Sequence, residues 1–192
     1  MKYRIVFLIG CLCLGVTFGQ EKREWERRIE RSEFPDSALE LLAPYLEGAK
    51  KIKFYLERDQ DKRSFEVKLK KRRLRYSIEF DQHGVLEDVE VRIREVDIPN
   101  ESFEAIRSDL GQRFSTYRIR KIQQQYPNTK ANPQEILKKA FQNLLIPELN
   151  YEIIMAGKET KRYQTYEFLY NAEGGFLQKR IVRPINKDHV LY

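Results

Sequence analysis

The chain of 192 residues has 36 lysines and arginines against 29 aspartates and glutamates, which gives a formal net charge of +7. This excess is too small to predict a nucleic-acid partner by itself, although it permits an anionic partner or an anionic surface. The length is sufficient for a well-buried core, so stability does not require a metal or a disulfide framework.

The N-terminus has the features of a cleavable secretory signal. Basic residues precede an apolar run over residues 5–18, small residues follow, and polar chain begins at Gln20. The run is shorter than the roughly 17–25 apolar residues that span a bilayer. We therefore predict a signal peptide over residues 1–19, cleavage between Gly19 and Gln20, and a periplasmic or secreted protein.

Both cysteines, Cys11 and Cys13, lie inside this predicted signal. The residues before Cys11 also resemble a bacterial lipobox, so a lipoprotein anchored through Cys11 is an alternative, although the apolar run ahead of it is short. Cleavage after Gly19 would leave a mature chain without cysteine. Disulfides, thiolate metal sites and cysteine nucleophiles would then be excluded.

Residues 20–33 are mostly charged around Trp25 and Ile29. The spacing of four residues places these two side chains on one face of a helix. We predict a short leading helix that docks through Trp25, with a mobile arm that docks on a partner as the alternative.

The rest of the chain repeats a pattern after 64 residues. The segment FPDSALELL begins at Phe34, and the similar segment IPNESFEAI begins at Ile98. Apolar residues in both recur at helical spacings. This duplication predicts a first repeat over residues 34–97 and a second over residues 98–192, each beginning with a helix. The matched apolar positions are Leu39, Leu42 and Leu46 in the first and Phe103, Ile106 and Leu110 in the second.

After each predicted helix the apolar residues alternate with polar ones. An alternation with a period of two residues is typical of strands with one buried and one solvated face, as in antiparallel sheets. The clearest runs are Ile52 to Leu56, Phe65 to Leu69, Leu74 to Phe80 and Val89 to Ile93 in the first repeat, and Tyr151 to Met155 and Tyr166 to Tyr170 in the second.

The second repeat contains an insertion of about 22 residues. Asn132, Pro133 and Glu135 have the spacing of a helix N-terminus, where an Asn side chain caps and Pro occupies the first turn. We predict an inserted helix over about residues 132–145 that covers an open sheet face or edge. A lid or a partner-binding element is the alternative.

These elements predict an α+β fold of two tandem helix-plus-four-stranded antiparallel sheet repeats, with an inserted helix in the second. The arrangement resembles the PepSY-like family of small exported modules, which share their architecture with tandem-repeat beta-lactamase inhibitor proteins. The resemblance covers about residues 34–183 and implies a binding or inhibitory module, often acting on exported peptidases. It assigns no role to an individual residue. The segments that carry it are the two helix starts and the hairpins YSIEFDQHGVLEDVEVRI and YEFLYNAEGGFLQKRIV.

Catalytic arrangements are not evident in the sequence. His83 lies in a predicted turn and His189 lies near the end of the chain, so neither is placed to serve as a supported catalytic base or a zinc ligand. Asp88 and Glu90 follow the first hairpin turn, and we expect them on a solvated strand face. The sequence therefore predicts a protein that is not an enzyme and has no cofactor or metal.

Basic residues are densest around the tip of the first predicted hairpin, and a smaller group lies at the corresponding tip of the second repeat. A solvated turn explains such charge, and it also discourages pairing of sheet edges. The functional alternative is an anion-binding tip whose contacts depend on salt. The candidate residues are Lys68, Lys70, Lys71, Arg72, Arg73, Arg75, Lys158, Lys161 and Arg162.

The leading functional hypothesis is an exported, non-enzymatic binding or inhibitory module that presents an antiparallel sheet face to a protein partner, such as an exported peptidase. The alternative is an envelope-associated binder of a polyanion, either an acidic glycan or an anionic lipid, that uses the basic hairpin tip. Nucleic acid is an unlikely ligand, because the net charge is modest.

Overall fold

The computed structural model describes residues 20–182 apart from 23, 60–61, 130–131 and 159–161. The strands are β1 (Gln20–Lys22), β2 (Glu24–Ile29), β3 (Lys50–Asp59), β4 (Lys62–Lys71), β5 (Leu74–Asp81), β6 (Leu86–Ile93), β7 (Thr116–Pro127), β8 (Asn150–Lys158), β9 (Tyr163–Asn171) and β10 (Phe176–Val182). The helices are α1 (Asp36–Leu46), α2 (Asn100–Arg113) and α3 (Pro133–Phe141), with short 3-10 turns at Arg31–Glu33 and Glu95–Asp97.

All described strands belong to one sheet, in the order β1-β10-β9-β8-β7-β6-β5-β4-β3-β2. Neighbours from β2 to β10 pair antiparallel, and β1 pairs parallel with β10. The β6–β7 ladder, which matches Val89 with Tyr126 and Ile93 with Ile122, continues the sheet across the middle of the chain. The prediction of two tandem helix-plus-four-stranded repeats is therefore wrong. Apolar alternation locates strands, but it does not tell where one sheet ends and another begins.

The leading segment also differs from its prediction, because residues 20–33 contain β1 and β2 in place of a helix. Ile29 is buried and pairs with Phe54 of β3, whereas Trp25 remains 40% exposed. A spacing of four residues places two side chains on one face of a strand as well as on one face of a helix. The pair Trp25 and Ile29 therefore did not distinguish the two structures.

Helix α3 lies in the segment where the inserted helix was predicted, but it ends at Phe141. The Asn132 side chain accepts a hydrogen bond from the Glu135 backbone at 3.2 Å, which caps the N-terminus. Ile136, Leu137 and Ala140 are buried against β6 and β7. The helix thus covers part of the apolar face of the sheet. No helix in the described part of the chain is both long and apolar enough to cross a membrane.

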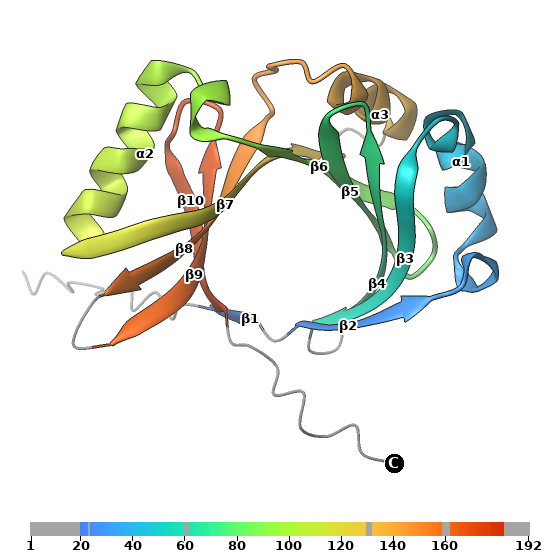
Figure 1. Cartoon of the computed structure of the whole chain (residues 1–192), viewed down its shortest axis with the longest axis horizontal. Helices are drawn as coiled ribbons and strands as arrows, with labels where there is room; N and C mark the ends of the chain where they lie inside the picture. Colours follow the sequence, from blue (N-terminus) through green and yellow to red (C-terminus); the bar gives the residue numbers. More distant parts are fainter. Residues whose placement is uncertain (1–19, 23, 60–61, 130–131, 159–161, 183–192) are drawn as a thin grey trace, which may run out of the picture.

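The apolar core lies between the helices and the outer face of the curled sheet (Figure 1). Val67, Ile78, Val89 and Tyr126 follow one another across β4, β5, β6 and β7, and all four are fully buried. Because side chains alternate along a strand, the residues between them point to the inside of the curl. These inward positions are mostly polar, so the sheet has an apolar outer face and a charged inner face.

The two edges of the sheet are brought together by the start of the chain. β1 pairs with β10 at one edge and β2 pairs with β3 at the other, with a single residue between β1 and β2 in the sequence. An ion pair between Arg180 of β10 and Asp59 of β3, at 4.0 Å, also joins the edges. Figure 1 shows the resulting ring of strands, with the helices outside it. The inner face is therefore enclosed on most sides.

The turn between β9 and β10 approaches the N-terminus of α2 so closely that it requires glycine. Gly174 has a φ of +83°, and a Cβ there would meet the Ser102 carbonyl oxygen and the Ala105 Cβ. We expect Gly174→Ala to lower the free energy of unfolding by about 2 kcal/mol or more, because the backbone is strained and the carbonyl cannot move aside. Urea unfolding measures this change.

Gly111 provides the matched control for this substitution. It lies in α2, and a Cβ there would meet nothing within 4 Å. Gly111→Ala should stabilise the protein by about 0.5 kcal/mol, since alanine restricts the unfolded chain. Equal effects of the two substitutions would contradict the close approach of the turn to α2.

Candidate functional site

A cavity of about 540 Å³ lies on the inner face of the sheet. Its lining includes seven cationic side chains and seven carboxylates, whereas pockets for drug-like molecules are mostly apolar. The cations are Lys51, Lys53, Lys68, Lys70, Arg75, Arg92 and Lys121, and the carboxylates are Glu26, Glu57, Glu66, Glu79, Glu90, Glu152 and Glu167.

Several of the interior carboxylates are paired with cations of the protein itself. The Lys68 ammonium lies 2.6 Å from a Glu26 oxygen and 2.7 Å from a Glu66 oxygen, and Glu66 is buried. Burial alone would lower the pKa of Lys68, but the charges of Glu66 and Glu26 outweigh it and raise the pKa above its ordinary value. Similarly, Glu152 lies 3.7 Å from the Lys121 ammonium.

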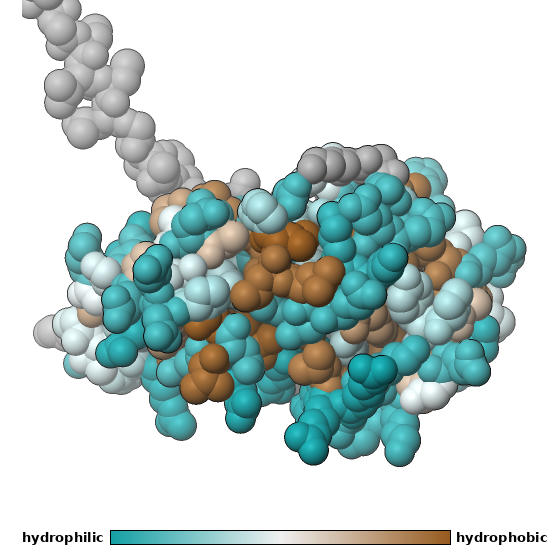
Figure 2. Space-filling view, turned by 90° about the horizontal axis from the view of Figure 1, so that it is seen from above, coloured by the Kyte–Doolittle hydropathy of each residue, from teal (hydrophilic) through white to brown (hydrophobic). Residues whose placement is uncertain are grey.

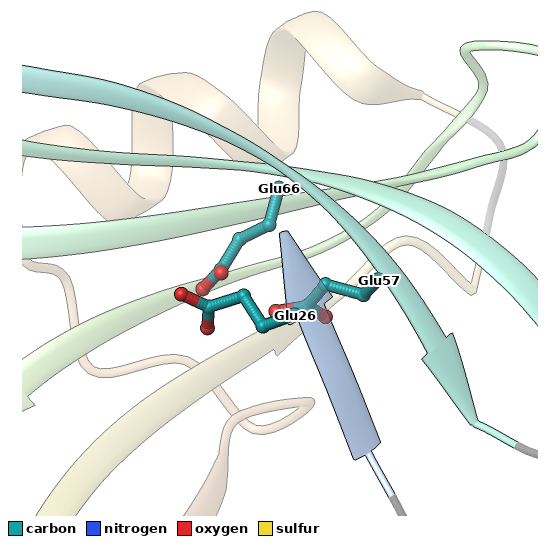
Figure 3. Close-up of side chains that lie close together, drawn as sticks. All are labelled: Glu26, Glu57 and Glu66. Carbon is teal, nitrogen blue, oxygen red and sulfur yellow. The ribbon is translucent and has the colours of Figure 1, made fainter. Parts of the chain in front are cut away.

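Figure 3 shows the carboxylates of Glu26, Glu57 and Glu66, on β2, β3 and β4, close to one another. One oxygen from each lies within 4.8 Å of the others, a grouping that resembles the oxygen ligands of a calcium site. The Lys68 ammonium already contacts two of the three carboxylates. We therefore interpret this group as an ion-pair network and assign no metal to it.

Two further acids on β6 have strongly shifted pKa values. Burial, together with the charge of Glu152, raises the pKa of Asp88 to about 7, although a hydrogen bond of 2.9 Å from Gln125 opposes the shift. Burial and Glu152 also raise the pKa of Glu90, which accepts a hydrogen bond from Gln123. The expectation that these acids lie on a solvated face is wrong for Glu90, which is 7% exposed. The curl of the sheet encloses the polar face.

A buried acid beside ionised carboxylates is also the arrangement that acid–base catalysis needs. In this cavity, however, each carboxylate has a partner within the protein: Lys68 for Glu26 and Glu66, Gln123 for Glu90, and further interactions for the rest. These interactions hold the carboxylates in place within the cavity.

The basic residues predicted at the first hairpin tip are divided among different environments. Lys68 lies inside the cavity, Lys70 and Arg75 line it, and Lys71 donates to the Tyr45 carbonyl oxygen at 3.0 Å, near the end of α1. A cation at a helix C-terminus is stabilising, so Lys71 has a structural role. The turn residues, Arg72 and Arg73, are exposed and form the solvated tip of the hairpin.

The basic residues of the second repeat are not brought to this place. Lys158 ends β8 and Arg162 directly precedes β9, and these ends of β8 and β9 lie on the opposite side of the molecule from the β4–β5 hairpin (Figure 1). Lys161 lies outside the described residues, as does Gly19 of the predicted cleavage site, whereas Gln20 begins β1. The predicted anion-binding residues therefore do not form a single surface.

Four cations of the cavity lie outside the predicted set. Lys51 and Lys53 alternate with Ile52 and Phe54, Arg92 lies between two buried residues, and Lys121 precedes buried Ile122. The same alternation that located the strands therefore marked these side chains as inward. They lie outside the dense runs of charge, so only their alternate positions along the strands indicate them.

Apolar side chains also reach the surface. Val96, Leu145 and Tyr163 are each more than half exposed, and Leu177 is half exposed. Figure 2 shows apolar side chains grouped on one face and surrounded by polar ones. Apolar patches with polar surroundings are common in protein–protein contacts.

Comparisons with known proteins support the fold. The chain is similar in structure to a DUF2874 family protein from Bacteroides ovatus, with a TM-score of 0.53 and 8% identity over 77% of this chain and 87% of that one. It is also similar to a BLIP-like protein from Bacteroides fragilis, with a TM-score of 0.51 and 10% identity over 81% of this chain and 92% of that one.

No family model and no curated protein matches the sequence. The structural likeness therefore establishes a BLIP-like fold, and membership of the PepSY-like family stays a prediction.

Proposed function

We propose that the protein is an exported, non-enzymatic binding module that receives a segment of a protein partner in its charged cavity. The observation that carries this proposal is the asymmetry of the cavity. Its carboxylates have partners within the protein, whereas five of its cations, Lys51, Lys53, Lys70, Arg75 and Arg92, form no ion pair among the described residues. Such a surface is prepared to bind a negatively charged group.

The fold supports the same function. The side chains of the cavity project from paired strands, so they are held at fixed spacing before a partner arrives. Binding to a preorganised surface requires little ordering of the protein and therefore retains more of the interaction free energy. A similar solved structure is described as BLIP-like, which also favours a binding role for this chain. An exported peptidase is one such partner, in line with the resemblance of the sequence.

We test this proposal by filling the cavity. Ile154 lines it, and Ile154→Trp reduces its volume without changing its charge. Wild-type protein should retain a specific partner from the envelope fraction of its native host, and Ile154→Trp should lose that partner. The retained proteins are identified by mass spectrometry, and near-UV circular dichroism confirms that the variant is folded.

Gln112→Trp is the control, because Gln112 is exposed on α2 and does not line the cavity. It should retain the same partner as the wild type. Retention of an identical set of proteins by Ile154→Trp, or no retention by the wild type, would overturn the proposal.

The unpaired cations also support a second candidate function, an envelope-associated binder of an acidic glycan or anionic lipid. Binding of that kind would not require the cavity volume, so it should survive Ile154→Trp. It should weaken strongly with salt, since it is mainly electrostatic.

A further inference from the structure

Five cations on four neighbouring strands form one end of the cavity, which we name the basic rim: Lys51 and Lys53 of β3, Lys70 of β4, Arg75 of β5 and Arg92 of β6. Lys70 lies directly opposite Arg75 in the β4–β5 ladder. Tyr76 is paired with Val91, so Arg75 and Arg92 lie next to each other at the end of the β5–β6 ladder.

The rim places like charges opposite one another. Such cross-strand pairs are destabilising, whereas Lys68 and Lys121 of the same cavity lie beside carboxylates. Within the described residues, no carboxylate lies within ion-pair distance of the five rim cations. A ligand that brings negative charge to the rim would remove the repulsion and gain several charge-assisted contacts.

We propose that the basic rim binds acidic side chains of an extended segment or loop of a protein partner. This inference rests on the proposed function and names the chemistry of the partner. It relocates the anion site from the hairpin tip to the cavity and adds Lys51, Lys53 and Arg92, none of which belongs to the dense basic run.

The shape of the site favours a protein segment over other anions. The rim lines a concave cavity on the inner face, which an extended segment can enter and a flat bilayer cannot. Proteins that bind single-stranded nucleic acid combine a basic groove with open aromatic platforms. The two aromatic side chains of the cavity do not provide one, because Tyr76 is buried and the Lys68 ammonium lies 4.6 Å from the centre of the Tyr55 ring.

The test uses a fluorescein-labelled peptide of alternating glutamate and serine, with fluorescence anisotropy as the readout. Lys70→Ser/Arg75→Ser should weaken binding by about tenfold and reduce its dependence on salt between about 50 and 500 mM NaCl. Lys138→Ser/Arg107→Ser is the matched control, because it removes the same two residue types from exposed positions on α3 and α2. The control should bind like the wild type.

A second pair of variants separates the rim from the hairpin tip. Arg72→Asn/Arg73→Ser removes the charge of the solvated turn, and asparagine tolerates the positive φ of 54° at residue 72. This variant should bind the peptide like the wild type. Stronger loss here than in Lys70→Ser/Arg75→Ser would overturn the assignment to the rim.

Competing anions complete the test. Phosphatidylglycerol vesicles and a single-stranded oligonucleotide should bind more weakly than the peptide, and their residual binding should not depend on Lys70 and Arg75. Rim-dependent binding of either one, with none of the peptide, would overturn the inference. If a partner in the envelope pull-down is lost with Ile154→Trp but kept with Lys70→Ser/Arg75→Ser, the proposed function stands and the acidic-segment inference fails.

Discussion

Asp88→Asn combined with Glu90→Gln should make the protein more stable at neutral and alkaline pH and remove most of its pH dependence. In the wild type, the pKa of Asp88 is raised from 3.8 to about 7, and that of Glu90 is also raised. The folded protein therefore keeps protons that the unfolded chain releases above about pH 4. By linkage, the free energy of unfolding is highest below about pH 4 and falls as the pH rises toward 7. Asp88 alone accounts for a fall of about 4 kcal/mol.

This prediction is measured by urea unfolding at about pH 5, 7 and 8.5, followed by the fluorescence of Trp25, the only tryptophan. Neutral amides preserve the size of both side chains and can still accept from Gln125 and Gln123. Glu101→Gln/Glu104→Gln, at the exposed surface of α2, is the control and should leave the pH dependence unchanged. A wild-type stability that is flat or rises between pH 5 and 8.5 would contradict the buried acids.

Arg180→Leu should lower the free energy of unfolding by about 3 kcal/mol. The guanidinium donates to the buried Glu167 carboxylate and lies 4.0 Å from Asp59 on the opposite edge of the sheet. Removing it deprives a buried carboxylate of its cation and also loosens the contact between the two edges. Thermal and urea unfolding measure the change.

The double variant Arg180→Leu/Glu167→Gln should recover most of the lost stability, because the buried carboxylate that lost its cation is then replaced by a neutral amide. Lys139→Leu, which breaks an ion pair with Glu135 on the surface of α3, should cost about 0.5 kcal/mol. If Glu167→Gln gives no recovery, the stabilising role assigned to the Arg180–Glu167 ion pair is wrong.

Local patterns in the sequence located many of the elements. The run from Leu74 to Phe80 coincides with β5, and the run from Val89 to Ile93 lies within β6. The spacing of Asn132 and Glu135 marked the start of α3. These signals depend on a few neighbouring residues, so they can be recognised in the sequence without knowledge of the fold.

The pairing of strands that are far apart in the chain could not be predicted from such local patterns. The joining of β6 to β7 and the docking of β1 on β10 depend on residues far apart in the chain, and no local period specifies them. For the same reason, the burial of the acidic residues in the candidate site could not be predicted from the sequence. Glu90 occupies an inward strand position, which the alternation indicates, but its burial follows from a curl that involves the whole sheet.

The meeting of the first and last strands has a consequence for how the protein matures. Gln20 pairs with Arg180, so this closure needs nearly the entire chain and comes late in synthesis. Until then, strands at the two ends expose unpaired backbone groups, which are templates for association with other chains. We expect the newly made chain to be vulnerable to aggregation at this stage, and the finished ring to be protected from it.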